Sequence, residues 1–404
     1  MHICTGAFKS SPNKSVLCES GQLPLSIHRD YVTMKNALKF MAGDSPTKSL
    51  FDLNDVFINN HPPSFPIRAN RLLSTVIDNN LNFILPYSSP PPWVLRKVNV
   101  CSHLYYLSKN SLFTPSHYQQ LTIEHISSKG QHYEIYTDGS KTSQGVGFAA
   151  VSSNKTYAFS LPKEASVFTA ELMAILYALK LAEELESNKF VVYSDSRSAI
   201  EALRSYSHSN QLVKQIKVFF NNLYAKGIDV QLCWIPAHVG ICGNELADSA
   251  AKNAITLPTI DNRVPINDYI NTLNPFKWDQ WQNLWNDVPH TNKLKELKSS
   301  VKPWSSSVQV TRKMEVILTR LRIGHTKLTH GHLMTSPNDV PPVCTQCNTD
   351  LTIKHIFGTC AKYDNKRRLL FGNKSFIEIL EESKDFNIRN ILKFLQELNL
   401  VNEI

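Results

Sequence analysis

The pattern of apolar and polar positions is most regular in the middle of the chain. Short apolar runs bounded by turn residues predict three strands at 134–138, 145–151 and 157–161, in an antiparallel meander. Between residues 168 and 186, apolar residues recur every three or four positions, which predicts an amphipathic helix. The segments expected after it are a strand at 190–195, helices at 196–204 and 212–225, a strand at 228–235 and a helix at 243–254.

This order of elements predicts an α/β domain built on a mixed five-stranded sheet with helices across its faces. Regularity decreases on both sides, where we expect helical and irregular extensions. A helix is expected at 27–41, and the proline-rich stretches 59–66 and 88–93 are typical of linkers. The chain of 404 residues is therefore divided into an N-terminal part (1–130), a central domain (131–258) and a C-terminal part (259–404).

Composition narrows the class of protein. Hydrophobic residues make up 42% and charged residues 19%, with 14 glycines and 21 prolines, which excludes collagen-like, coiled-coil and wholly disordered chains. No apolar run approaches the length of a membrane span, and Met1–Gly21 lacks the pattern of a secretory signal. Eight cysteines are too few for a disulfide scaffold. We expect a globular protein of the nucleus or cytoplasm with no membrane partner.

The net charge of +9 favours a polyanionic partner, and its distribution adds detail. Residues 1–130 and 259–404 each carry +5, whereas residues 131–258 carry −1. We expect the centre to hold carboxylates for chemistry and the flanks to contact phosphate groups. The basic residues expected to bind nucleic acid in the C-terminal part are Arg312, Lys313, Arg320, Arg322, Lys327, Lys366, Arg367 and Arg368.

Four carboxylates stand at informative places in the central domain. Asp138 lies on the first strand, Glu171 in the first long helix, Asp195 at the end of the fourth strand and Asp248 in the last helix. If the first and fourth strands are adjacent, these side chains converge, and neighbouring carboxylates need a cation to offset their repulsion. Oxygen ligands favour Mg²⁺ or Mn²⁺, and two such ions suit phosphodiester hydrolysis.

Acidic residues at this spacing occur in many proteins, and the residues around them are more specific. The strings Tyr136-Thr137-Asp138-Gly139-Ser140, Thr169-Ala170-Glu171-Leu172, Tyr193-Ser194-Asp195-Ser196 and the segment 234–248 closely resemble, in order, the motifs of type 1 ribonuclease H. The resemblance implies a ribonuclease H-like fold and endonucleolytic cleavage of the RNA strand of RNA–DNA hybrids. It also implies that Asp138, Glu171, Asp195 and Asp248 are catalytic metal ligands.

His238 follows the fifth predicted strand, in a loop that resembles the mobile histidine loop of the same family. The resemblance implies that it shuttles a proton or assists product release. The basic protrusion of some members is missing, because only residues 206–210 connect the two helices where it would lie. The alternative function is a non-catalytic nucleic-acid-binding protein or a structural subunit.

A second cluster lies in the C-terminal part, as Cys344-x2-Cys347-x7-His355-x4-Cys360. Three thiolates and one imidazole complete a tetrahedral zinc shell, which predicts a structural Zn²⁺ site. With the aromatic and basic residues that follow it, the segment resembles the Cys-Cys-His-Cys segment of non-LTR retrotransposons.

The start of the chain, 4–12, resembles the region after the polymerase active site in Jockey- or I-like elements. The residues 1–130 would then be a remnant of the thumb and connection region. No Tyr-x-Asp-Asp polymerase motif occurs, so the chain alone is not expected to reverse-transcribe. We expect it to be the C-terminal part of such a polyprotein, with a reverse-transcriptase polypeptide as a further partner.

Overall fold

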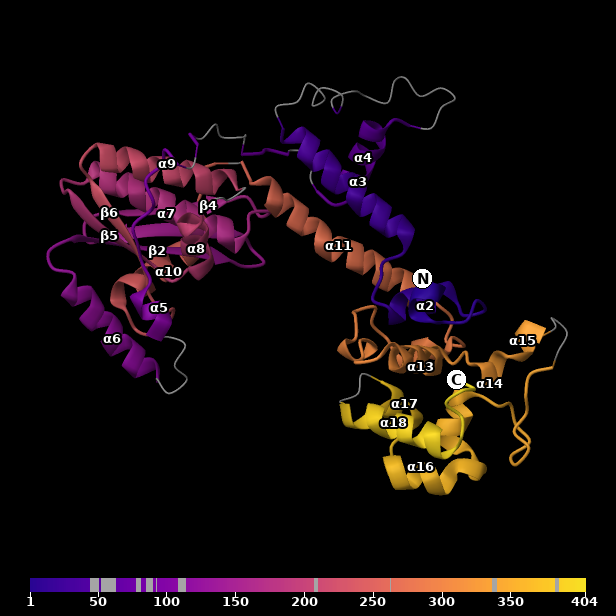
Figure 1. The fold of residues 1–404 in the computed structure, drawn as a ribbon. Coiled ribbons are helices and arrows are strands. Elements are labelled where there is room, and N and C mark those ends of the chain that lie inside the picture. The colour runs from indigo at the N-terminus through magenta and orange to yellow at the C-terminus, as the bar shows by residue number, and fades with distance from the viewer. Residues whose placement is uncertain are drawn as a thin grey trace. The chain divides into compact units, whose positions relative to one another are not determined.

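The chain forms two compact units, shown as ribbons in Figure 1. One unit comprises residues 33–274 and is called the sheet unit here; the other combines residues 1–32 with 275–404 and is called the helical unit. The boundaries fall within helices α3 (Leu25–Met41) and α11 (Ile266–Asn286). The structure, a computed structural model, describes residues 1–43, 51, 63–77, 81–84, 90–91, 93–107, 114–206, 210–261, 263–335, 340–381 and 385–404.

The sheet unit is built on a mixed sheet of six strands, which confirms the predicted α/β class and its flanking helices. The strand order is β1-β6-β5-β2-β3-β4. The meander β2-β3-β4 is antiparallel, and β2, β5, β6 and β1 are parallel to one another. The strands are β1 (Val100–Cys101), β2 (Tyr133–Lys141), β3 (Val146–Ser152), β4 (Thr156–Leu161), β5 (Lys189–Ser194) and β6 (Asp229–Trp234).

One strand more is present than the sequence predicted. β1 pairs with β6 at the edge of the sheet and comes from the segment before the predicted central domain. It has only two residues, too few for an alternating pattern to reveal it. The Pro-rich stretch 59–66 also differs where it is described, because α4 begins at Phe65 with Pro66 in its first turn, where a missing N–H costs nothing.

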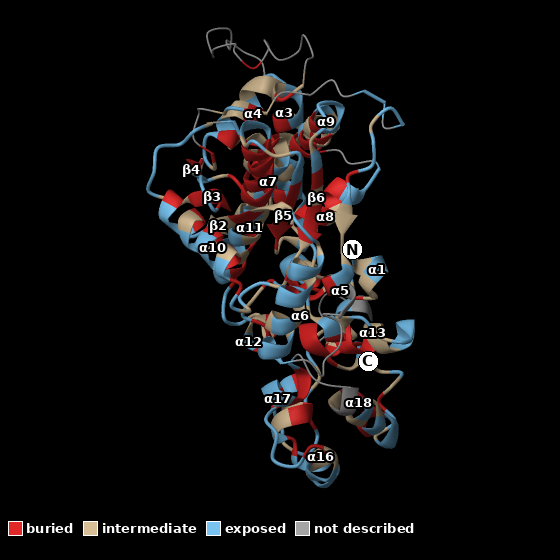
Figure 2. Ribbon diagram, turned by 90° about the vertical axis from the view of Figure 1, so that its left-hand side faces the viewer, coloured by how far each residue is buried: buried red, intermediate tan, exposed pale blue. Residues whose placement is uncertain are grey.

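Helices cover both faces of the sheet, and much of α7 and of the strands is buried (red in Figure 2). Alternate residues of the strands belong to different cores. Ile135 and Val192 pack with α7, α8 and α9, whereas Tyr136 and Tyr193 pack with α10 and with residues of α5 and α6. The helices of this unit are α4 (Phe65–Leu73), α5 (His103–Leu107), α6 (Pro115–Ser128), α7 (Val167–Glu184), α8 (Arg197–Arg204), α9 (Gln211–Ala225) and α10 (Cys242–Ala254).

The helical unit joins segments from opposite ends of the chain. In Figure 1, α2 (indigo) lies beside α13 (orange). Arg320 donates to the Gly6 carbonyl at 2.7 Å, and Cys18 shares a core with Trp281 and Trp285. Its helices are α1 (His2–Thr5), α2 (Asn13–Glu19), α12 (Lys293–Leu297), α13 (Arg312–Ile323), α14 (Lys327–His330), α15 (His332–Thr335), α16 (Asp364–Phe371), α17 (Phe376–Leu380) and α18 (Asp385–Glu397), with short turns η3 (Ser305–Ser307), η4 (His355–Thr359) and η5 (Ala361–Tyr363).

The division of the chain into 1–130, 131–258 and 259–404, drawn from the sequence, stays a prediction. Residues 88, 89 and 92 of the stretch 88–93 lie outside the described residues, as does 207–209 in the connection between α8 and α9. None of the helices in the described ranges is long and apolar enough to cross a membrane.

Candidate active site

Two of the predicted carboxylates lie next to each other because of the register of parallel strands. Thr137 of β2 is the partner of Ser194 of β5. Asp138 and Asp195 are the next residues along these neighbouring strands. Asp138 is only 7% exposed, and the Asn244 side-chain amide donates to the Asp195 carboxylate at 3.2 Å. The strand pairing therefore places two acids at one point of the sheet.

Glu171 reaches the same point from α7. The Ser166 side chain begins this helix by accepting from the Thr169 backbone, which places Glu171 in its second turn. Gly139 permits the close approach of helix and strand, since a Cβ there would lie 2.6 Å from the Glu171 nitrogen. One ligand oxygen each of Asp138, Glu171 and Asp195 lies within 4.8 Å of the others.

The electrostatics of this group disfavour three negative charges. Burial, and then the charges of Asp195 and Asp248, raise the pKa of Asp138 to about 7. Burial first and the neighbouring Asp138 and Asp195 next raise the pKa of Glu171 well above its usual range. The Oε2 atom of Glu171 is buried and has no hydrogen-bond partner in the described structure. A buried oxygen without a donor, among converging carboxylates, fits a divalent cation.

Asp248 of α10 lies beside the group rather than within it. Its charge is among the causes that raise the pKa of Asp138 and of Asp195. Its carboxylate pairs with Lys252, one turn later on the same helix, at 2.6 Å. The Lys252 ammonium thus supplies part of the compensating positive charge in this structure.

His238 lies in the loop between β6 and α10 with an exposed side chain. Its backbone has φ of 54°, a left-handed conformation that histidine adopts more readily than most residues. The charge of a protonated His238 is among the causes that lower the pKa of Asp138 and of Asp195, so the imidazole lies near enough to act on both carboxylates electrostatically. The loop is held from outside by Gln119 of α6, which donates to the Gly240 carbonyl at 3.0 Å.

Asn244 is a residue that reasoning from the sequence missed. It is 2% exposed, and its amide nitrogen orients the Asp195 carboxylate while its Oδ1 atom is buried without a partner in the described structure. The only signal was its place in the string 234–248, where it precedes Asp248 by one helical turn.

The part of the chain that carries the four carboxylates, His238 and Asn244 has a counterpart among known families. Residues 130–256 match the RNase H family. Among solved structures, RNase H1 from the halophilic archaeon Halobacterium salinarum NRC-1 is 21% identical, with 31% of this chain and 98% of that chain covered and a TM-score of 0.25. No curated protein matches the chain.

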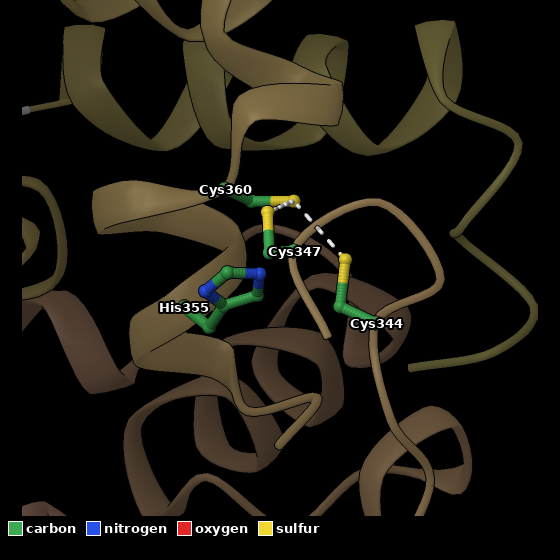
Figure 3. A group of neighbouring side chains, drawn as sticks. All are labelled: Cys344, Cys347, His355 and Cys360. Atoms are coloured by element: carbon green, nitrogen blue, oxygen red, sulfur yellow. Dashed lines mark hydrogen bonds between the residues drawn. The ribbon is translucent and has the colours of Figure 1, made fainter. Parts of the chain in front are cut away.

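The cysteine cluster lies outside the RNase H segment, in the helical unit. Cys344, Cys347, His355 and Cys360 place one ligand atom each within 4.8 Å of the others (Figure 3). The sulfur of Cys360 lies 3.7 Å from that of Cys344 and 4.0 Å from that of Cys347. Tetrahedral zinc holds its sulfurs about 3.8 Å apart, given bonds of about 2.3 Å. The Nε2 atom of His355 is buried without a partner in the described structure, so the donor set fits zinc.

The predicted nucleic-acid contacts separate into exposed and internal side chains. Arg322 is fully buried and pairs with Glu19 at 2.9 Å, and Arg367 donates to the Cys360 carbonyl at 3.0 Å. Arg320 donates to the carbonyl of the C-terminal Ile404. These three guanidinium groups serve the helical unit internally. The exposed side chains of the predicted set are Arg312, Lys313, Lys327, Lys366 and Arg368.

Proposed function

We propose that this chain is a divalent-metal-dependent endoribonuclease that cleaves the RNA strand of RNA–DNA hybrids. The observation that carries the proposal is the convergence of Asp138, Glu171 and Asp195, with raised pKa values, inside the segment that matches the RNase H family. Asp248 completes the proposed ligand set. Mg²⁺ or Mn²⁺ ions, when bound, would activate a water molecule and stabilise the leaving oxygen.

The residues of the chain have distinct parts in the proposed hydrolysis. The carboxylates hold the ions, and Asn244 fixes the orientation of Asp195. His238, exposed beside the carboxylates, accepts or donates a proton as water adds to phosphorus and the bond to the 3′ oxygen breaks. The products carry 5′-phosphate and 3′-hydroxyl ends. Hybrids are distinguished from DNA by their 2′-hydroxyl groups in the minor groove.

Cleavage of a labelled hybrid by the purified full chain, with Mg²⁺ and with EDTA, tests this function. Asp195→Asn should lower the rate at least about a hundredfold while binding persists, because it removes a ligand charge and little volume. Asp229→Asn, an exposed acid at the start of β6, is the matched control and should cut normally. Binding without cleavage by the parent protein would instead favour a non-catalytic module. An Asp195→Asn rate above a tenth of the parent rate would contradict the ligand role.

The cysteine cluster supports a structural zinc site in the same protein, because its four protein ligands leave no position for a water. The exposed cations of the helical unit, which also holds the cluster, are our proposed contacts to nucleic acid. We further infer an origin in a non-LTR retrotransposon, with a reverse-transcriptase polypeptide as partner, from the resemblance of the segment 344–368. Co-purification with such a polypeptide tests the partner.

A further inference from the structure

A second group of metal-binding side chains lies in the sheet unit, away from the carboxylates. The Nε2 atom of His125 lies 3.3 Å from the sulfur of Cys101 and 3.6 Å from the sulfur of Cys233. All three ligand atoms lie within 4.8 Å of one another. We propose that Cys101, Cys233 and His125 bind a Zn²⁺ ion.

The distances fit a shared cation. Zinc bonds of about 2.3 Å to sulfur and about 2.0 Å to nitrogen, at a tetrahedral angle, separate sulfur from nitrogen by about 3.5 Å. Two thiolates with an imidazole form a soft donor set that favours zinc over Mg²⁺.

A fourth position remains for a water molecule or for His103. The imidazole of His103 stacks on that of His125, with ring centroids 5.5 Å apart. Cys233 is fully buried, whereas the other two ligands are partly exposed, so an ion can enter from the side of α5 and α6.

The three proposed ligands come from three different elements of the sheet unit, so a bound ion would hold these elements together. Cys101 ends β1, His125 belongs to α6 and Cys233 belongs to β6, where it is the register partner of Cys101. Only Cys233 lies within the segment 130–256 that matches the RNase H family. A metal bound here would fasten the preceding strand and helix to the RNase H sheet. Since α6 also holds the loop of His238 through Gln119, the ion would keep that loop in place.

The test is the zinc content of the full chain after exhaustive dialysis, compared with the double variant Cys101→Ser, Cys233→Ser. The variant should lose one equivalent of zinc per chain. Cys242→Ser removes an exposed cysteine of the same unit and should lose none. A Cys344→Ser, Cys347→Ser variant should keep the proposed ion, which distinguishes the two clusters. If the double variant fails to fold, His125→Gln serves as the second test. It keeps both thiols and should weaken zinc retention.

Cobalt substitution gives a second measurement that does not depend on activity. The site adds two thiolates to the three of the Cys344 cluster, so the double variant should lose about two fifths of the thiolate-to-cobalt charge-transfer absorption. Equal zinc content in the parent and the double variant would overturn the proposal. So would a Cys101–Cys233 disulfide in freshly purified protein, revealed by two fewer titratable thiols and no metal at this site.

Discussion

At the scale of single residues, the carboxyl group of Asp138 is held where its charge is unfavourable. Its pKa is raised from an ordinary 3.8 to about 7, mainly by burial. A carboxyl with a higher pKa in the folded state binds its proton more tightly there than in the unfolded chain. The stability that the fold gains from this tighter proton binding is complete below about pH 4 and is lost as the pH rises through 7. The metal-free fold therefore carries the full cost of this charge only above the pKa of Asp138, for example at about pH 8.

Asp138→Asn should consequently stabilise the metal-free protein at pH 8 by on the order of a few kcal/mol, and change it little at pH 4. Urea unfolding in EDTA at both pH values measures the difference. Asp229→Asn is the exposed control and should show no such pH dependence. A gain from Asp138→Asn that is equal at both pH values would contradict this account.

The residue scale also shows what the sequence could and could not predict. Asp138, Glu171, Asp195 and Asp248 were predictable because each stands in a distinctive local string. Arg322 stands in a basic stretch and was predicted to bind nucleic acid. Its partner Glu19 is 303 residues away in the sequence, and both side chains are buried. No local pattern encodes such a pairing, since burial depends on which distant segments meet.

At the scale of elements, the beginning of α7 determines where Glu171 lies. Asp268, near the start of α11, accepts hydrogen bonds from the Ser166 backbone at 2.9 Å, the Ser166 hydroxyl at 2.8 Å and the Thr169 hydroxyl at 2.6 Å. Asp268 is only 4% exposed. A carboxylate at a helix N-terminus is favoured by the helix dipole as well as by these donors. Residues beyond the RNase H segment thus hold the helix that carries Glu171.

Asp268→Ala should destabilise the sheet unit by about 2–4 kcal/mol, because it leaves one buried donor on Thr169 and two partly buried donors on Ser166 without their acceptor. It should also lower the rate of hybrid cleavage if Glu171 is displaced. Asp261→Ala, which removes an exposed ion pair with Arg263, is the control and should change stability by less than about 0.5 kcal/mol. Thermal unfolding and cleavage rates of both variants check the prediction, and equal effects would refute the capping role.

Most elements of the sheet unit could be predicted because their apolar periods are long and regular. The helix expected at 168–186 is α7 (Val167–Glu184), and the last expected helix is α10 (Cys242–Ala254). β1 could not be predicted, because two residues carry no period. The role of Asp268 could not be either, since a side-chain cap supplied from about 100 residues away leaves no local signature.

At the scale of the whole molecule, the proposed carboxylate metal site and the proposed zinc site of the Cys344 cluster lie in separate compact units. The carboxylates belong to the sheet unit, and Cys344, Cys347, His355 and Cys360 belong to the helical unit. Cys344→Ser with Cys347→Ser should release one zinc and lower the melting temperature of the helical unit. It should weaken nucleic-acid binding and leave the rate at saturating hybrid unchanged. Zinc analysis with saturation kinetics checks both halves, and a large loss of saturated rate would contradict the separation.

The basic C-terminal part, 259–404, also contributes to the folding of the rest of the chain. Deleting 259–404 would remove Asp268 from α7 and would also remove the core partners of residues 1–32, so it would alter folding as well as charge. Neutralising exposed side chains avoids this difficulty. The ion pairs that these cations form in the described structure are with acids that are at least partly exposed, such as Arg368 with Asp364 at 2.8 Å, and such pairs hold their partners weakly.

Replacing these five residues, Arg312, Lys313, Lys327, Lys366 and Arg368, by glutamine should therefore flatten the salt dependence of hybrid binding. Each lost phosphate contact makes the negative slope of log affinity against log salt shallower by about 0.9. The preference for hybrid over duplex DNA should persist, because phosphate contacts carry no information about the strand. The measurement is a salt titration of binding by the full chain in Ca²⁺, which limits cleavage.

A control of equal charge separates contact from net charge. Neutralising five exposed cations of the sheet unit, Lys155, Lys163, Lys189, Arg204 and Lys226, changes the total charge by the same amount. If the helical unit contacts the phosphates, the first set flattens the slope more than the control does. Equal slopes for both variants would mean that the helical unit acts only through the overall field, and loss of hybrid preference in the first variant would place recognition there instead.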